Sequence, residues 1–377
     1  MTQVVHVTDN FSPSGFGITT ALMELTGQLG YRGVKQVIFS PGHDGIKPPD
    51  SVKLQQLPIR GWLKKWCYPV GFHQLFDSLV KDDSMVHIHG VWMAPQYLAA
   101  KRSLKKGIPC VLSPHNMLGE WWRKNGIIKQ TKKSLYWNLI SKHYLTRVNL
   151  LHALSPIERN ALHKYFPHHT IEVIPNGINL HQIDQALLKS SNSSEKAEKY
   201  ILILGRLHKV KGIELFINAL AKINPSQIIR TIIAGPTHQE KYLRQLQNLV
   251  RSKNLENKIT FLGPVFGQTK WNLLRQAWVV CAPSYSEGIS MVALEAMSSS
   301  VPIITTHSAG IPHVPEGGGI LIQPDVEELS QALIQSLSWS DNERAARGRA
   351  ARGLIEKYYS WDVVGPQYLD LYQGLQS

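Results

Sequence analysis

The chain has 377 residues and a formal net charge of +14 at pH 7, and a length beyond the usual range of one hydrophobic core predicts two domains. Its three cysteines are isolated and show no C-x-x-C spacing, which argues against a disulfide framework and against a zinc site. No apolar run approaches the roughly 20 residues of a membrane-spanning helix, and no signal-peptide pattern opens the chain, so we expect a cytoplasmic protein.

The chain begins with a predicted strand, a glycine-containing loop and a helix. Residues 4–8 form the strand, and apolar residues at helical spacing continue to Leu29. Between them, Gly15 and Gly17 could begin a dinucleotide fingerprint, but Thr20 replaces its third glycine. The loop therefore fits a plain turn as well as it fits a phosphate contact.

Two further predicted strands of the N-terminal half end in polar residues. Residues 85–89 end in His89, and residues 109–113 lead to His115 and Asn116. In parallel α/β sheets, ligands bind beyond the carboxyl ends of the strands, so we expect both ends to face a cleft. A structural role in the core is the alternative for each histidine.

The end of the first domain is marked by a helix and a turn. Ser155 and Glu158 form a capping box around Pro156, which predicts a helix to about Tyr165. Asn176 and Gly177 then form a turn, and residues 186–199, rich in Ser, Lys and Glu, are typical of a flexible connection.

The second half opens with a strand, a basic loop and a helix. The strand covers residues 200–204, Gly205, Arg206 and Lys211 lie in the loop, and residues 213–223 have the pattern of an amphipathic helix. Because the helix dipole adds positive potential where the strand ends, we expect Arg206 and Lys211 to bind a diphosphate. A solvated basic loop is the alternative.

Two glutamates, Glu287 and Glu295, flank the start of another predicted helix. Their spacing is about two helical turns, so both carboxylates could point into one cleft and accept hydrogen bonds from vicinal hydroxyls. Gly288, Ile289 and Ser290 stand where the helix begins, and free N–H groups at such an end favour phosphate oxygens. This predicts a site for a sugar and its phosphate; two solvated surface acids are the alternative.

Positive charge is concentrated in the first half of the chain. Residues 1–180 hold 21 Lys and Arg against 10 Asp and Glu, whereas the remainder holds 20 against 17. Residues 101–150 alone contain eleven basic residues and one acid, Glu120, and their Trp and Tyr residues are Trp121, Trp122, Tyr136, Trp137 and Tyr144. Basic and aromatic residues together favour an anionic membrane surface. A nucleic-acid surface, for which no binding motif is seen, and a solvated face with buried aromatics are the alternatives.

Taken together, these motifs resemble the retaining nucleotide-sugar glycosyltransferases of the GT4 group, and the resemblance covers nearly the whole chain. Gly205-Arg206 with Lys211-Gly212 is similar to the diphosphate clamp of that family, and Glu287 to Glu295 is similar to its Glu-x7-Glu signature. Further similarities are found at Ala234-Gly235-Pro236, Phe261-Leu262-Gly263 and Pro175-Asn176-Gly177-Ile178.

The resemblance implies the α/β GT-B fold. Two Rossmann-like domains would face each other across a central cleft, and the C-terminal helix would cross back to the N-terminal domain. The acceptor-binding domain would comprise residues 1–179 plus about 358–377, and the donor-binding domain residues 180–357. An ordinary terminal helix on the second domain is the alternative for the last segment.

The resemblance also implies residue roles. Glu295 would bind the ribose, Glu287 the transferred sugar, the backbone from Gly288 to Ser290 the distal phosphate, and His115 a sugar hydroxyl. The catalytic set would be His115, Arg206, Lys211 and Glu287, and the donor-binding set would be Gly15, Gly17, Gly205, Arg206, Lys211, Glu287, Gly288, Ile289, Ser290 and Glu295. No metal and no cofactor besides the nucleotide-sugar donor would be needed.

Two positions depart from the pattern of that family. The loop at Gly15 and Gly17 usually contains adjacent glycines, and His313 stands where Glu is common after Pro312. Donor preference therefore does not follow from the resemblance.

We expect a transferase that moves a hexose from a UDP- or GDP-sugar to a lipid-linked or surface-polysaccharide acceptor, at the cytoplasmic face of a membrane. A soluble enzyme making a small glycoside or a sugar-phosphate conjugate is one alternative. A catalytically silent protein that binds membrane or nucleic acid is another, although it would not need the full set of acids and bases.

Overall fold

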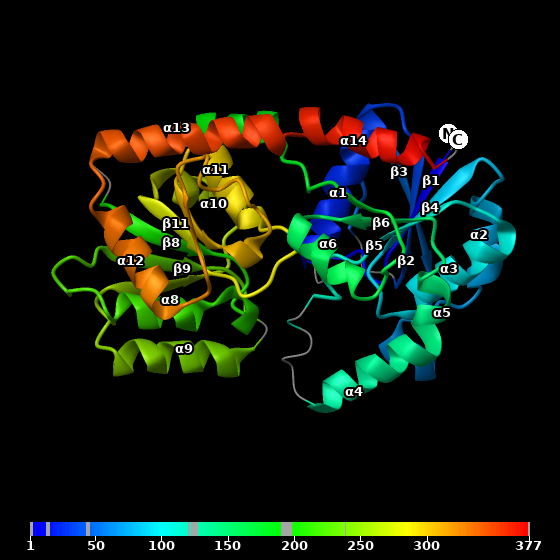
Figure 1. The fold of residues 1–377 in the computed structure, drawn as a ribbon, viewed down its shortest axis with the longest axis horizontal. Helices are drawn as coiled ribbons and strands as arrows, with labels where there is room; N and C mark the ends of the chain where they lie inside the picture. Colours follow the sequence, from blue (N-terminus) through cyan, green and yellow to red (C-terminus); the bar gives the residue numbers. More distant parts are fainter. Residues whose placement is uncertain are drawn as a thin grey trace. The chain divides into compact units, whose positions relative to one another are not determined.

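The computed structural model describes residues 3–12, 16–42, 46–119, 121, 127–189, 198–237 and 239–375. It consists of two compact units, Met1–Gly177 with Asp362–Ser377 and Ile178–Trp361. Each unit is a parallel β-sheet with helices, as expected for two Rossmann-like domains (Figure 1). Gly15, Glu120 and Trp122, and most of the predicted connection at 186–199, lie outside the described residues.

The first unit contains a seven-stranded sheet in the order β3-β2-β1-β4-β5-β6-β7. Its described strands are β1 (Gln3–Val7), β2 (Gln36–Pro41), β3 (Val52–Leu57), β4 (Ser84–His89), β5 (Cys110–Ser113), β6 (Leu150–Ala153) and β7 (Ile171–Val173). All neighbouring strands pair in parallel. The direction of the strand order changes between β1 and β4, and such a switch point is where α/β sheets bind ligands.

The second unit repeats this plan, and its described residues form six strands in the order β10-β9-β8-β11-β12-β13. They are β8 (Tyr200–Leu204), β9 (Arg230–Ala234), β10 (Ile259–Gly263), β11 (Val279–Ala282), β12 (Ile303–Thr306) and β13 (Ile320–Ile322). Here the switch point lies between β8 and β11, which pair in parallel. The loops that follow these two strands hold the predicted diphosphate cations and the first of the two glutamates.

Helices cover both sheets. In the first unit they are α1 (Phe16–Tyr31), the 3₁₀ segment η2 (Gly61–Trp66), α2 (Phe72–Leu79), α3 (Ala94–Lys106), α4 (Ile127–Tyr136), the π-helical segment η4 (Trp137–Ser141), α5 (Lys142–Leu145) and α6 (Pro156–His163). In the second unit they are α7 (Leu180–Leu188), the 3₁₀ turn η5 (Lys209–Lys211), α8 (Ile213–Leu220), α9 (Glu240–Ser252), α10 (Gly267–Gln276), α11 (Met291–Ser298), the 3₁₀ turn η6 (His307–Ala309), α12 (Val326–Leu337) and α13 (Asp341–Tyr358).

The last helix, α14 (Trp361–Gln373), belongs to the first unit, although the preceding α13 belongs to the second (Figure 1). Tyr372 Oη lies 2.8 Å from His87 Nδ1 on β4, and Tyr368 Oη lies 3.3 Å from His152 Nε2 on β6. Both tyrosines are buried. These contacts attach the C-terminal helix to the N-terminal sheet, as the GT-B fold requires.

The capping box predicted before α6 is only half formed. Ser155 Oγ accepts a hydrogen bond from Glu158 N at 3.2 Å, as expected. The Glu158 carboxylate, however, accepts from Leu154 N at 2.8 Å and from Asn116 N rather than from Ser155 N. This side chain therefore connects α6 to the loop after β5 instead of closing its own helix end.

None of the described helices combines the length and the hydrophobicity that crossing a membrane would require.

Candidate active site

The loop after β8 brings the predicted cations to the switch point of the second unit. Lys211 ends the turn η5, and Gly212 begins α8 with φ +66°. A Cβ atom on Gly212 would lie 2.1 Å from the carbonyl oxygen of Pro283, so only glycine allows this approach. The loops after β8 and β11 are thereby packed directly against each other.

Lys211 forms an ion pair with one of the predicted glutamates where these two loops pack together. Its Nζ lies 2.7 Å from Glu287 Oε1, which also accepts a hydrogen bond from Ser284 Oγ at 2.6 Å. Arg206, from the same loop as Lys211, is half-buried, and burial lowers the pKa of its guanidinium while the charge of Glu287 opposes that shift. Two cations and one carboxylate thus share one small region.

The start of α11 has the features of an anion site. Ser290 is its N-cap, and its backbone N–H donates to Ala309 O at 2.9 Å. The Ser290 hydroxyl is buried and, within the described residues, has no hydrogen-bond partner. A helix N-terminus of this kind offers N–H groups and positive potential to a phosphate.

The backbone before α11 is held in place by the segment after β12. Glu287 N donates to Ser308 O at 2.9 Å. Gly310 has φ +77°, and a Cβ atom there would lie 2.3 Å from the carbonyl oxygen of Gly288. The predicted phosphate-binding backbone from Gly288 to Ser290 therefore rests on a glycine contact that leaves no room for another side chain.

The second glutamate, Glu295, lies on α11 and has a partner that the sequence did not indicate. Lys270 Nζ on α10 lies 3.0 Å from Glu295 Oε1 and also 4.3 Å from the centre of the Trp271 ring. Both charged side chains are mostly shielded, at 24% and 18% exposure. Lys270 is therefore positioned to fix the direction of this carboxylate.

In the first unit, the loop after β5 presents His115 on a strained backbone. His115 and Asn116 have φ values of +52° and +58°, which non-glycine residues rarely adopt. Glu158 supports this conformation by accepting the hydrogen bond from Asn116 N. Burial raises the pKa of the Glu158 carboxyl to about 7. Strain of this kind persists where surrounding structure enforces it, which is common at functional sites.

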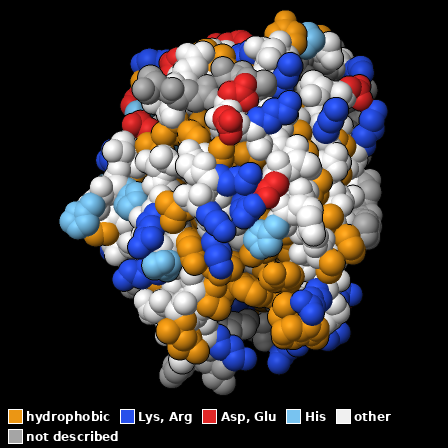
Figure 2. Space-filling model, turned by 90° about the vertical axis from the view of Figure 1, so that its right-hand side faces the viewer, with side chains coloured by type: hydrophobic (Ala, Val, Ile, Leu, Met, Phe, Trp, Pro, Cys, Tyr) orange, Lys and Arg blue, Asp and Glu red, His pale blue; other side chains and the backbone are white. Residues whose placement is uncertain are grey.

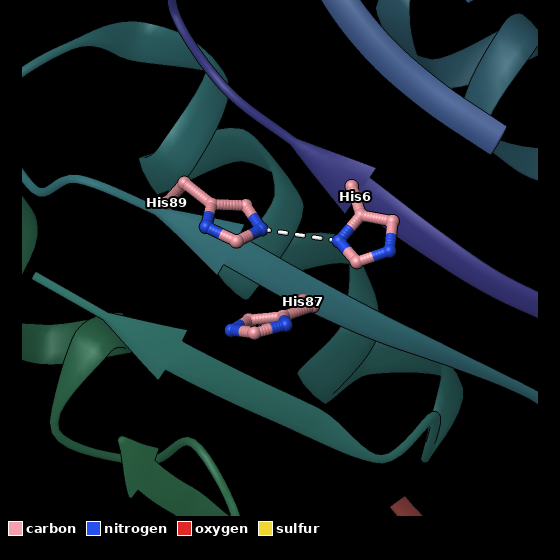
Figure 3. A group of neighbouring side chains, drawn as sticks. All are labelled: His6, His87 and His89. Atoms are coloured by element: carbon pink, nitrogen blue, oxygen red, sulfur yellow. Dashed lines mark hydrogen bonds between the residues drawn. The ribbon is translucent and has the colours of Figure 1, made fainter. Parts of the chain in front are cut away.

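His115 continues a cluster of buried histidines on β1 and β4. Figure 3 shows His6 on β1 beside His87 and His89 on β4, with His89 Nε2 3.1 Å from His6 Nδ1. These three form a group close enough to hold one metal ion among the described residues. Each of their six ring nitrogens, however, already has a hydrogen-bond partner at 2.6–3.1 Å. The cluster is better described as a hydrogen-bond network.

Three further positions from the sequence analysis have other surroundings. Gly17 lies in the exposed first turn of α1, and no heavy atom lies within 4 Å of the position its Cβ would take. His89 belongs to the histidine network and lies in the core, at 2% exposure. His313 stacks on Tyr358 with ring centres 4.4 Å apart, and its Nδ1 lies 2.9 Å from Glu316 Oε1.

Those aromatic residues of segment 101–150 whose side chains the structure describes do not form the exposed surface that we expected. Trp137 is buried against Tyr165 and Phe166, and Tyr136 and Tyr144 are half-buried. They pack inward because the helix from α4 to α5 needs an apolar face against the sheet unit. On the outward side the exposed apolar residues are aliphatic, Leu135 and Leu139 at 58% and 71% exposure.

A neighbouring segment, η2, carries an exposed aromatic residue. Trp62 is 78% exposed, and the lysines that follow it are exposed as well. Trp66 at the end of η2 contacts Tyr136 of α4, with ring centres 5.9 Å apart, so the two segments adjoin. Figure 2 shows one face of the molecule on which basic side chains lie among hydrophobic ones.

Comparisons with known proteins address both units. The family model of the glycosyl transferases group 1 matches residues 184–353, and that of glycosyltransferase family 4 matches residues 17–182. An uncharacterized glycosyltransferase of Methanocaldococcus jannaschii is 32% identical over 218 residues, which are 55% of this chain and 55% of that protein. A GDP-mannose-dependent monoacylated alpha-(1-6)-phosphatidylinositol monomannoside mannosyltransferase of Corynebacterium glutamicum is 27% identical over 223 residues, 55% of this chain and 57% of that protein. These matches span only about half the length of either relative.

Solved structures share the fold of the whole chain. Sucrose-phosphate synthase of Thermosynechococcus elongatus superimposes with a TM-score of 0.76 at 19% identity and covers 100% of this chain and 99% of its own. Anabaena HepE in complex with UDP and glucose gives 0.75 at 16% identity, covering 99% of this chain and 100% of its own. With both family models matched in sequence order on two Rossmann-like units, the chain belongs to the GT4-type glycosyltransferases, the glycosyl transferases group 1.

Proposed function

We propose that this protein is a retaining glycosyltransferase that moves a hexose from a UDP- or GDP-sugar to a lipid-linked or surface-polysaccharide acceptor. The observation that carries this proposal is the convergence of Arg206, Lys211 and Glu287 at the switch point of the second unit, beside the start of α11. Cations, an anion-binding helix end and an acid for hydroxyl groups are the parts that a nucleotide-sugar site needs.

The cations account for the chemistry of the leaving group. When the anomeric C–O bond breaks, negative charge develops on the departing nucleoside diphosphate, and preorganised cations lower the barrier electrostatically. Arg206 and Lys211 are assigned this role. Because they supply two positive charges, we propose that transfer does not depend on a divalent metal ion, and the rate should be unchanged in EDTA.

The other predicted residues are assigned to the phosphate, the sugar and the ribose. The buried Ser290 hydroxyl and the N–H groups at the start of α11 are assigned to the distal phosphate. Glu287 is assigned to hydroxyls of the transferred sugar, and Glu295 to the ribose. His115 of the first unit is assigned to a further sugar hydroxyl, because a strained loop presents it.

Retention of the anomeric configuration follows from family membership as part of the same proposal. Among the described residues around the switch point of the second unit, Glu287 is the carboxylate beside the cations, and it is engaged by Lys211 and Ser284. We therefore assign deprotonation of the acceptor to the departing phosphate rather than to a protein base. A transferred sugar of unchanged anomeric configuration, detected by NMR of the product, would support the proposed retention.

The acceptor is assigned from the surface of the first unit. Trp62, Leu135 and Leu139 are exposed, and Lys64, Lys65, Lys132 and Lys142 are exposed on the same segments. Apolar groups that enter the headgroup region and lysines that attract anionic lipids together favour a peripheral membrane location on the cytoplasmic side. The Corynebacterium relative, which acts on a phosphatidylinositol mannoside by its name, is consistent with a lipid-linked acceptor.

A soluble enzyme that makes a small glycoside or sugar phosphate is the second candidate. It is favoured by the full-length fold similarity to sucrose-phosphate synthase. The two candidates differ in their use of the exposed surface, which a soluble enzyme would not need.

Two experiments test these assignments. A panel of UDP- and GDP-sugars screened by thermal shift should reveal the donor. If no nucleotide or nucleotide sugar stabilised the protein, the donor site would be contradicted.

Sedimentation with anionic and neutral vesicles should show binding to the anionic ones at low salt. Leu139→Glu should weaken it, whereas Leu188→Glu, at an 84% exposed leucine of the second unit, should not. Equal effects of both variants would favour the soluble candidate.

A further inference from the structure

The histidine network of the first unit contains a chain that ends at His115. Gln36, His6, His89 and His115 follow one another through hydrogen bonds of 3.1, 3.1 and 2.9 Å. The first three side chains are buried, at 4%, 0% and 2% exposure, and His115 is half-buried. The chain thus runs from the core to the loop that carries His115.

The buried end of this chain, Gln36, fixes the direction of every hydrogen bond in it. Gln36 donates through Nε2 to the backbone carbonyl of Thr26 at 2.8 Å, so its Oε1 faces His6. A carbonyl oxygen can only accept, and therefore His6 must donate through Nε2. This leaves a lone pair on His6 Nδ1.

The bond at His6 determines the bonds that follow it along the chain, because a neutral imidazole has one donor and one acceptor. His89 must donate through Nε2 to His6 Nδ1, which leaves a lone pair on His89 Nδ1. His115 must then donate through Nε2 to His89 Nδ1. Its own Nδ1 is left with a lone pair, for which the described part of the chain provides no hydrogen-bond partner.

The protein keeps these rings neutral, so each has one donor and one acceptor nitrogen. Burial lowers the pKa of His6 to about 4 and that of His115 to about 3, and it lowers the pKa of His89 as well. His115 is consequently a weak base that accepts a hydrogen bond without taking the proton. A neighbouring network, in which His152 donates through Nε2 to Ile174 O at 2.8 Å, is separate from this chain.

We propose that Gln36, His6 and His89 are positioning residues that hold His115 as its Nε2–H tautomer, so that Nδ1 accepts a hydrogen bond from a hydroxyl of the sugar substrate. Only the assignment of the donor group as a sugar hydroxyl rests on the proposed function. The tautomer itself follows from the anchor at Thr26. A substrate group at this point must be a hydrogen-bond donor, so the chain selects a hydroxyl over an ether oxygen or a fluorine.

The experiment compares three variants with the wild-type chain by ¹⁵N NMR of histidine-labelled protein, which distinguishes a protonated ring nitrogen from one with a lone pair. His89→Phe removes the acceptor for His115, whereas His89→Asn retains one, because its Oδ1 takes the place of Nδ1. His152→Phe is the matched control: it replaces another buried histidine of the same sheet but leaves the bond between His89 and His115 intact.

We expect the Nε2–H form of His115 in the wild type, in His89→Asn and in His152→Phe, and mainly the Nδ1–H form in His89→Phe, because an Nε2–H group there would face the apolar ring without an acceptor. The value of kcat/KM with the nucleotide sugar found by the panel should fall roughly tenfold in His89→Phe only, the effect of one lost hydrogen bond. Affinity for the free nucleotide, UDP or GDP, should not change.

An Nδ1–H signal from His115 in the wild type would overturn the proposal whatever the activity. Equal losses of kcat/KM in His89→Phe and His152→Phe, with the same tautomer in both, would overturn it as well. Failure of the proposed function would be seen differently. The wild type would transfer no sugar, but the NMR spectrum without substrate would still report the tautomer of His115.

Discussion

Lys211 Nζ lies 2.7 Å from Oε1 of Glu287, across the two loops that meet at the switch point of the second unit. The pair is largely shielded from water, with the side chains 23% and 13% exposed. Shielded ion pairs interact more strongly than exposed ones because water screens them less. The diphosphate cation and the sugar-binding acid that we assign are therefore coupled, and each holds the other in position.

Replacing Lys211 with Met should lower kcat by about one to two decades. A charge-assisted hydrogen bond to the leaving diphosphate is worth about 1.5–3 kcal/mol, which corresponds to that loss of rate. Steady-state kinetics with the nucleotide sugar measure it, and the thermal transition should remain largely intact. Lys209→Met is the control, since Lys209 is exposed on the same turn. Equal kinetics for both variants would exclude Lys211 from the leaving-group site.

Glu295→Ala should weaken nucleotide binding by about tenfold, because a carboxylate that binds ribose hydroxyls contributes hydrogen bonds to a charged group. Lys270→Ala should weaken it less, since Lys270 acts only by orienting Glu295. Calorimetric titration with UDP and GDP checks both values, with Glu256→Ala at an exposed site as the control. An undiminished affinity in Glu295→Ala would remove the ribose contact from the proposal.

Much of the second unit could be predicted because its signals are local. The strand at 200–204 coincides with β8, and the helix start expected at Gly288 to Ser290 is confirmed by α11. Short apolar runs and loop glycines report directly on nearby backbone. Lys270, in contrast, is 25 positions from Glu295, and nothing in the spacing of either residue indicates their contact.

The histidine chain was not predictable for the same physical reason. His6 is 30 positions from Gln36 and 83 from His89, and they meet only because β1 lies between β2 and β4. The inward packing of Trp137 likewise depends on which side of its helix faces the sheet. Composition correctly located the basic segment but could not assign its aromatic residues to surface or core.

Gly310→Ala should weaken binding of the nucleotide sugar. The new Cβ atom would lie 2.3 Å from the carbonyl oxygen of Gly288, so this carbonyl would have to move and would shift the start of α11. Gly33→Ala separates this clash from backbone strain: Gly33 has a similar φ of +81°, but nothing lies within 4 Å of its Cβ position. Both variants should lose about 1 kcal/mol of stability from strain, and only Gly310→Ala should lose affinity. Comparable affinities in titration would show that the glycine contact does not shape the site.

Acid should destabilise the first unit because its histidines are buried as neutral rings. The folded pKa of His6 and of His152 is lowered to about 4. Their contribution to stability is thus complete above the unfolded pKa of about 6.5 and is lost as the pH falls toward 4. At pH 5.5 the loss is roughly 1 kcal/mol for each such ring. Hydrogen exchange of β1 and β4 at pH 7.5 and 5.5, corrected for intrinsic rates, measures it; equal protection would contradict the burial of neutral rings.

Glu158 should act in the opposite direction. Its folded pKa is raised from 4.5 to about 7, so its contribution is present below pH 4.5 and is lost as the pH rises through 7. Acidification from pH 7.5 to 5.5 therefore raises the free energy of unfolding by roughly 2 kcal/mol through this carboxyl, which partly offsets the loss caused by the histidines.

Glu158→Gln removes this gain in stability, so the acid-induced loss in the first unit should become larger by about that amount. The glutamine keeps one of the two backbone hydrogen bonds to Asn116 N and Leu154 N, and the loss of the other lowers stability equally at both pH values. An unchanged difference between the two pH values in the variant would mean that Glu158 is already ionised at pH 5.5 in the folded protein.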